Sequence, residues 1–238
     1  VRLIGQGGFR TVYRAWDMAL ARPVALKESL DADPELQRQF EREARQLANL
    51  RHPNLPIIFD YFTLPGGRQF LIVDLIEGQN LDDLMRERGG RLSETEALAA
   101  IRQVADAVNY LHTRKPPIIH CSIKPSKIVI ADNRFLLMDS GVSQNYDDDS
   151  RTTEGIKTVS PPFSAPEQYT GLVEPRSDVY SLGATLYNLL TGRQPPEAPN
   201  LSSGAKTLTP PRKINPDISE ATSQAVVAAM TTDAAERL

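Results

Sequence analysis

Apolar residues follow the period of strands in the first third of the chain and the period of helices in the rest. Short apolar runs bounded by Gly, Pro and polar residues predict three strands up to Lys27 and two more over 57–62 and 69–75. Between them, a Pro at the first helical position and an apolar face predict a helix over 34–50. Beyond the strands, apolar residues recur every three or four positions, and Ser93 opens a long helix. The pattern predicts an α+β protein with its strands first and its helices afterwards.

The remaining part of the helical region is divided by turn residues. A short helix is expected over 81–88, and a longer, apolar one stops at Gly192, because glycine commonly ends a helix in the left-handed conformation. The segment 194–216 is rich in Pro, Ser and Thr and predicts a loop. A helix is expected over 218–230, and another begins at Asp233.

Composition and charge are those of an ordinary globular protein, with 40% apolar and 24% charged residues in 238. A net charge of −3 argues against a nucleic-acid or anionic-membrane binder. No apolar run is long enough to span a bilayer. Cys121 is the only cysteine, so the chain forms neither an internal disulfide nor a cysteine-based zinc site, and we expect a reducing, cytoplasmic compartment. Because the chain starts at Val1, we expect it to be a fragment of a longer protein.

The richest local chemistry lies in the segment 118–130, where two apolar runs bracket a polar loop. This loop carries His120, the hydroxyl of Ser122 and the ammonium groups of Lys124 and Lys127. Polar groups gathered between two buried strands are typical of a functional site.

The loop resembles the protein-kinase catalytic loop, H-R-D-x-K-x-x-N, in register along its whole length. His120 and Lys124 match, but Ser122 stands at the position of the catalytic Asp and Lys127 at the position of the metal-binding Asn. Further kinase-like segments follow in the family's order: Gly5-Gln6-Gly7-Gly8-Phe9-Arg10, Val24-Ala25-Leu26-Lys27, Asp139-Ser140-Gly141 and Ala165-Pro166-Glu167. The residues of 165–169, Ala-Pro-Glu-Gln-Tyr, and of 177–187, Ser-Asp-Val-Tyr-Ser-Leu-Gly-Ala-Thr-Leu-Tyr, are similar to those of bacterial serine/threonine kinases.

This resemblance implies a bilobal protein-kinase-like fold. Its N-lobe, over 1–75, would be a small antiparallel five-stranded sheet with one main helix. Its C-lobe, over 76–238, would be larger and mainly helical. It also implies that Asp178 bonds the backbone near the catalytic His and that Arg237 pairs with Glu167.

The resemblance further implies a nucleotide site. In the family, the glycine-rich loop covers the phosphates and a strand Lys pairs with a helix Glu. The residues that match these and neighbouring positions are Gly5, Gly7, Val12, Ala25, Lys27, Glu43, Val73, Asp74, Ile76, Lys127, Val129 and Asp139. Val73 would be the gatekeeper, and the backbones of Asp74 and Ile76 would meet the adenine. Asp139 would ligate Mg²⁺ only if that ion is bound.

The two substitutions in the loop change its chemistry. A serine hydroxyl at position 122 is a negligible base near neutral pH, and general-base assistance is worth about 10²–10⁴-fold in rate. The ammonium of Lys127 repels a cation where the family's Asn ligates one. We therefore hypothesise a pseudokinase that binds ATP or another nucleotide with little or no dependence on Mg²⁺, and that regulates or scaffolds a protein partner or a neighbouring domain.

Two alternatives stay open from the sequence. One is a slow or unconventional serine/threonine kinase that uses Lys27, Asp139 and Lys124. The other is a scaffold that binds no ligand, with Arg10 filling the pocket or the pocket collapsed around Ser140, which replaces the Phe of D-F-G. Single positions also have simpler interpretations, since Lys127 can extend into solvent and a glycine cluster can be only a turn.

Overall fold

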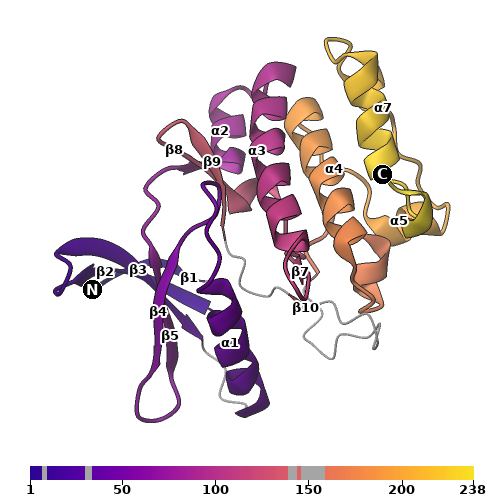
Figure 1. Cartoon of the computed structure of the whole chain (residues 1–238). Coiled ribbons are helices and arrows are strands. Elements are labelled where there is room, and N and C mark those ends of the chain that lie inside the picture. Colours follow the sequence, from indigo (N-terminus) through magenta and orange to yellow (C-terminus); the bar gives the residue numbers. More distant parts are fainter. Residues whose placement is uncertain (7–9, 30–33, 139–143, 146–158) are drawn as a thin grey trace. The chain divides into compact units, whose positions relative to one another are not determined.

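The structure is a computed structural model, and it describes residues 1–6, 10–29, 34–138, 144–145 and 159–238 (Figure 1). The chain divides into two compact units, Val1–Glu77 and Gly78–Leu238. Among the described residues, no helix combines the length and the apolar character that a bilayer crossing needs.

The first unit is a five-stranded antiparallel sheet with one helix. Its order is β1-β2-β3-β5-β4. The strands are β1 (Arg2–Gln6), β2 (Arg10–Asp17), β3 (Arg22–Ser29), β4 (Ile58–Thr63) and β5 (Gln69–Asp74). The helix α1 (Pro34–Leu47) contacts β4 and buries Phe40 and Ala44. This arrangement confirms the predicted sheet and its single main helix.

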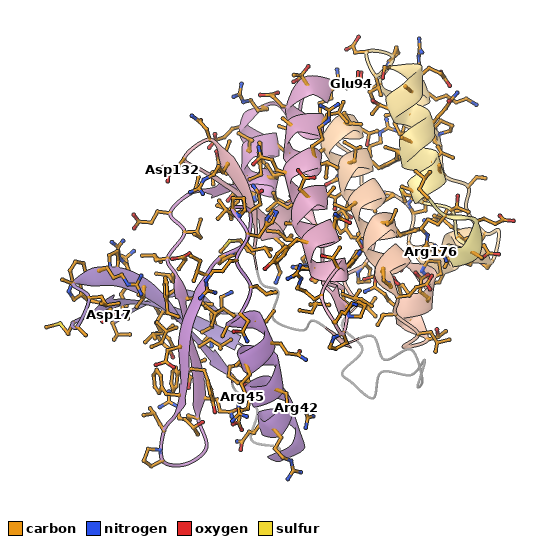
Figure 2. All side chains as sticks on the ribbon, in the orientation of Figure 1. Asp17, Arg42, Arg45, Glu94, Asp132 and Arg176 are labelled. Atoms are coloured by element: carbon orange, nitrogen blue, oxygen red, sulfur yellow. The ribbon has the colours of Figure 1, made fainter. Side chains whose placement is uncertain are left out.

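The second unit is mainly helical. Its longer helices are α2 (Leu81–Glu87), α3 (Glu94–His112), α4 (Pro175–Thr191) and α7 (Glu220–Ala229). Helix α4 packs between α3 and α7 and is buried along most of its length (Figure 1). Glu94 and Arg176, labelled in Figure 2, mark the beginnings of α3 and α4 at opposite ends of the pair, so these helices run antiparallel.

The connections between the helices of the second unit contain short strands and 3-10 turns. A three-stranded sheet has the order β6-β8-β9, with β6 at Gln79–Asn80, β8 at Ile128–Ala131 and β9 at Arg134–Leu137. A second small sheet pairs β7 (Ile118–Ile119) with β10 (Gln144–Asn145). The 3-10 turns are η1 (Pro125–Lys127), η2 (Pro166–Tyr169) and η3 (Ala234–Glu236). Thus β7 and β8 bracket the polar loop that the sequence singled out.

Local sequence explains where two of the long helices begin or end. The Ser93 side chain accepts from the backbone N–H of Glu96, whose carboxylate accepts from the N–H of Ser93, forming a capping box at the start of α3. At the end of α4, Gly192 has φ +69°, and a Cβ there would lie 2.7 Å from the carbonyl oxygen of Gly90. Only glycine fits both the conformation and the space.

The segment 194–216, predicted as a loop, is partly helical. It contains α5 (Ala198–Ser202) and α6 (Pro211–Ile214), each with Pro in its first two positions. Proline suits the first turn of a helix because its φ is already helical and it has no N–H to leave unpaired. A Pro-rich composition, which is typical of loops, can therefore also occur at the start of single helical turns. The helix expected from Asp233 is only the 3-10 turn η3.

Candidate functional site

One buried carboxylate, that of Asp178, anchors the backbone of the polar loop after β7. Asp178 of α4 is fully buried and accepts from the backbone N–H of His120 at 2.8 Å and of Cys121 at 2.9 Å. Its Oδ2 also lies 2.9 Å from Nε2 of His112, at the end of α3. These bonds confirm the expected role of Asp178, and they tie the loop to two helices. His112 therefore has a positioning contact in addition to its place at the helix end.

A second set of bonds fixes the loop at the residue before Ser122. Cys121 has φ +62°, a conformation that non-glycine residues rarely adopt. Its carbonyl accepts from Nε2 of Gln168 at 2.8 Å, and Oε1 of Gln168 accepts from the N–H of Ala165 at 2.9 Å. Thr185 of α4 donates to the carbonyl of Ile123 at 3.4 Å. The backbone is thus anchored on both sides of Ser122, which fixes the direction of its side chain.

The hydroxyl of Ser122 faces a second serine from a distant segment. Ser122 Oγ lies 3.4 Å from Ser160 Oγ, and Lys124 Nζ donates to Ser160 Oγ at 3.4 Å. The N–H of Ser160 donates to Ser164 Oγ at 2.8 Å, which holds this serine in place. Ser122, Lys124 and Ser160 are each partly exposed. The structure therefore gathers two hydroxyls and an ammonium at the position where the resemblance implies catalysis.

Lys127 belongs to the same turn of chain as Lys124. Its N–H donates to the carbonyl of Lys124 at 2.9 Å, and its own carbonyl accepts from the N–H of Met138 at 2.7 Å. The carboxylate of Asp82, at the start of α2, interacts electrostatically with Lys124. Burial raises the pKa of Asp82, while the charges of Arg86 and Lys124 lower it. The ammonium of Lys124 therefore lies within the influence of a carboxylate from α2.

The described part of this loop lacks the carboxylate ligands that Mg²⁺ prefers. Magnesium requires several oxygen ligands, usually including carboxylates, around a near-octahedral centre. No group of three or more His, Cys, Asp or Glu suited to a metal occurs within the described residues. Ser122 and Lys127 occupy the family's acid and amide positions, and an ammonium cannot ligate a cation. Asp139, the expected ligand, lies outside the described residues.

Most of the expected nucleotide residues of the first unit lie on one face of its sheet. Val12 pairs with Lys27, Ala25 pairs with Val73, and Gly5 pairs with Val12. Residues directly opposite in an antiparallel pair share a face. Lys27 is 8% exposed, so most of this residue is shielded from bulk water.

The other expected positions are distributed more widely. Asp74 ends β5, where its N–H donates to the carbonyl of Ile57 and its carboxylate accepts from the N–H of Ile57 at 2.9 Å. Ile76 follows in the connection and is half-buried, and Val129 lies on β8 of the second unit. Gly7 lies outside the described residues. Glu43 lies on α1, but its side chain is outside the described part, as is that of Arg10.

Away from the loop, a buried ion pair stabilises the second unit. Arg237 donates to Glu167 through Nη1 at 2.7 Å and through Nη2 at 3.2 Å, as predicted from the resemblance. The Arg237 side chain is fully buried, and it also donates to the carbonyls of Arg176 and Thr231. Ser177 adds a hydroxyl donor to Glu167 at 2.7 Å. A buried pair with its remaining groups bonded is the arrangement in which such a pair is tolerated.

Comparison with known proteins agrees with this architecture. Residues 1–237 match the family described as "Protein kinase domain". The serine/threonine-protein kinase PknA of Mycobacterium tuberculosis is 32% identical over 232 residues, which cover 91% of this chain and 52% of PknA. PknL of Mycobacterium bovis is 36% identical over 198 residues, covering 81% of this chain and 48% of PknL. The kinase domain of M. tuberculosis PknI superimposes with a TM-score of 0.79 at 26% identity, covering 100% of this chain and 88% of that domain.

The chain belongs to the protein kinase family, and its curated relatives are bacterial serine/threonine-protein kinases. It spans about a third to a half of the length of these relatives. The expected α+β protein-kinase fold is confirmed.

Three contributors to the site were not found in the sequence: Ser160, Gln168 and His112. Each reaches the loop across 38 or more residues or through a helix, so no local spacing reveals the contact. The position of Ser160 shortly before Ala-Pro-Glu is a sequence feature by which it could have been found.

Proposed function

We propose that this domain is a regulatory or scaffolding member of the protein kinase family, in which phosphoryl transfer is reduced to a trace. The observation that carries the proposal is the composition of the site around Ser122. Hydroxyls and ammonium groups lie where a carboxylate is needed to orient and deprotonate the attacking hydroxyl. Loss of general-base assistance alone lowers a rate by about 10²–10⁴-fold.

The framework around this site is fully bonded, which supports a retained binding role. Asp178 and Gln168 anchor the loop, and Arg237 pairs with Glu167, so these contacts of the scaffold are kept among the described residues. A nucleotide is the ligand that the first unit favours, because Lys27 and the apolar face that contains Val12, Ala25 and Val73 match the family's nucleotide positions. Magnesium contributes little to this binding, since Lys127 supplies the positive charge that a metal ion provides in the family.

A specific observation favours a second function, a slow serine/threonine phosphotransferase. The curated relatives at 32–36% identity bear the names of serine/threonine-protein kinases. These names favour a domain that still transfers phosphate over one that has lost this activity. In that case Lys124, 3.4 Å from Ser160, would act on the transferred phosphate. The two functions differ in one measurable quantity, the rate of phosphate transfer.

Transfer of radiolabelled phosphate from ATP to a general protein substrate separates these functions. We expect at most a trace of labelling above that of a Lys27→Ala variant in Mg²⁺ or Mn²⁺. Labelling well above such a trace, and abolished by Lys27→Ala, overturns the proposal and supports the kinase alternative. Thermal-shift titration with ATP, in Mg²⁺ and in EDTA, tests the nucleotide separately: equal stabilisation in both is expected, and none in either refutes nucleotide binding.

We further propose that the domain acts in the cytoplasm, where ATP is abundant, on a protein partner or on a neighbouring domain of its own chain. A pull-down in which the partner is retained by the folded domain and lost from an Asp178→Ala variant would support this.

A further inference from the structure

The turn that joins β2 to β3 is unusually apolar for an exposed hairpin. It reads Met18-Ala19-Leu20-Ala21 and follows shortly after Trp16. Trp16 is 55% exposed, Met18 84% and Leu20 62%. Six of the ten large apolar residues that are exposed in the described part of the chain lie within residues 1–20. Single exposed apolar residues are normal, but a contiguous group of them indicates a contact with a protein or a membrane.

The turn is held by its own hydrogen bonds and lies at one end of the sheet. Figure 2 shows Asp17 at the end of the first unit's sheet that is away from α1. Oδ1 of Asp17 accepts from the backbone N–H of Ala19 at 3.0 Å and of Leu20 at 3.1 Å. Backbone donors without a partner are costly in contact with lipid, and this carboxylate satisfies two of them. The turn can therefore enter an apolar phase without first changing its conformation.

The charge around this turn is positive, although the whole chain has a net charge of −3. Residues 1–24 contain four Arg, no Lys and a single acidic residue. Arg14 donates to Glu77 at 2.6 Å, and Arg22 lies 3.8 Å from the carboxylate of the turn, so part of the positive charge is offset. Arg2 is exposed and forms no ion pair with another described residue. The remaining excess complements anionic lipid headgroups, whereas it would repel the same turn of a second copy of this chain.

We propose that the β2–β3 turn inserts into the surface of a membrane that contains anionic lipids, with Met18 and Leu20 among the acyl chains and Trp16 at the level of the headgroups. Tryptophan suits that level because its ring is apolar and its N–H can bond a headgroup. In peripheral segments of this kind, apolar side chains reach about 5–10 Å into the interface while basic side chains contact the headgroups. This contact holds the domain at a membrane surface. It requires neither nucleotide nor phosphate transfer and so goes beyond the proposed function.

The fluorescence of Trp16 tests this proposal directly, because it is the only tryptophan of the chain. The whole chain is titrated with vesicles of phosphatidylcholine alone and with vesicles of phosphatidylcholine and phosphatidylglycerol in equal amounts. We expect the mixed vesicles to move the emission of Trp16 to shorter wavelength and to bind at least about tenfold more tightly than the neutral vesicles. Absence of the shift, or equal binding to both kinds of vesicle, overturns the proposal.

Substitutions assign the binding to the turn. Met18→Ser and Leu20→Ser should each weaken binding to the mixed vesicles at least about fivefold, because each removes apolar surface that the lipid would bury. Leu64→Ser, at an exposed position in the turn between β4 and β5, is the matched control and should alter binding less than about twofold. Arg2→Gln should weaken binding at least about threefold, whereas Arg102→Gln makes the same charge change at an exposed position of α3 and should have little effect.

The remaining outcomes separate lipid from other occupants. A shift of the Trp16 emission that grows with protein concentration and needs no vesicles indicates a second copy and overturns the proposal. Equal loss of binding in Leu64→Ser and in Met18→Ser also overturns it, since the effect is then one of general hydrophobicity. Thermal melting checks the folding of each variant. If Met18→Ser is unfolded, quenching of Trp16 by brominated lipid in the unmodified chain decides: quenching supports insertion, and its absence refutes it.

Discussion

Replacing Asp178 with Asn tests how the loop of the site is held. The carboxylate accepts two backbone N–H groups, one on each oxygen, and Nε2 of His112 lies 2.9 Å from the same Oδ2 that serves His120. An amide has one oxygen, so its NH₂ group must face one of these donors. If the amide oxygen stays with His120, the N–H of Cys121 loses its acceptor inside a fully buried site.

The expected loss of stability follows from these contacts. A hydrogen bond to a charged group contributes about 1.5–3 kcal/mol, and a buried donor left unsatisfied costs about 1–3 kcal/mol. Because the two terms overlap for the same donor, we expect the free energy of unfolding to fall by about 2–4 kcal/mol. Urea unfolding at pH 7, followed by fluorescence and by circular dichroism, measures this change.

Two controls make the result specific. Asp106→Asn, at an exposed position of α3, makes the same chemical change and should stay within about 0.5 kcal/mol of the unmodified chain. A double-mutant cycle with His112→Ala should give a coupling of at least about 0.5 kcal/mol, because the two side chains are in contact. A loss below about 0.5 kcal/mol for Asp178→Asn would refute the claim that this carboxylate holds the loop.

Three further changes test the scaffold and its response to pH. Arg237→Met leaves the mostly buried Glu167 carboxylate without its charged partner, with the Ser177 hydroxyl still donating to it. It should lower the free energy of unfolding by about 3–5 kcal/mol in urea, against less than about 0.5 for Arg176→Ala, whose side chain is half exposed. Gly192→Ala should lower the melting temperature by several degrees, since φ is +69° and the added Cβ would meet a carbonyl oxygen at 2.7 Å; an unchanged melting temperature contradicts that geometry. In the folded chain, hydrogen bonds from Ser219 lower the pKa of Glu94 below its ordinary value of 4.5. The ionised Glu94 therefore stabilises the fold above that pH, and this stabilisation is lost as the pH falls through the lowered pKa. Stability should therefore decline less steeply below about pH 5 in Glu94→Gln than in the unmodified chain, as followed by melting temperature against pH, and parallel curves would disprove the assignment.

Sequence patterns predicted the parts of the fold that are set by local chemistry. The capping box of Ser93 and Glu96 and the glycine that ends α4 act within one helical turn, so the residues themselves carry the information. The two short helices in 194–216 were missed because Pro-rich composition is shared by loops and by the first turns of helices. Whether such a turn closes depends on packing against other elements, which local sequence does not contain.

The sequence alone indicates which residues of the loop form the candidate site, but not which residues they contact. The positions of Ser122, Lys124 and Lys127 follow from a motif of fixed spacing. The partner hydroxyl of Ser160 and the anchoring amide of Gln168 come from a segment 38 or more residues away, and only the folded chain brings them to the loop.

We propose that the charge of the loop, and not decay of its scaffold, limits phosphate transfer. The most direct measurement compares the rate of phosphate transfer from ATP in the unmodified chain with that in the pair Ser122→Asp and Lys127→Asn, which restores the family's acid and metal ligand. We expect a rate at least 10²-fold higher in the restored pair, with the Lys27→Ala version of that pair as the inactive control. An unmodified chain that transfers phosphate within tenfold of the restored pair, and loses this activity with Lys27→Ala, would contradict the account.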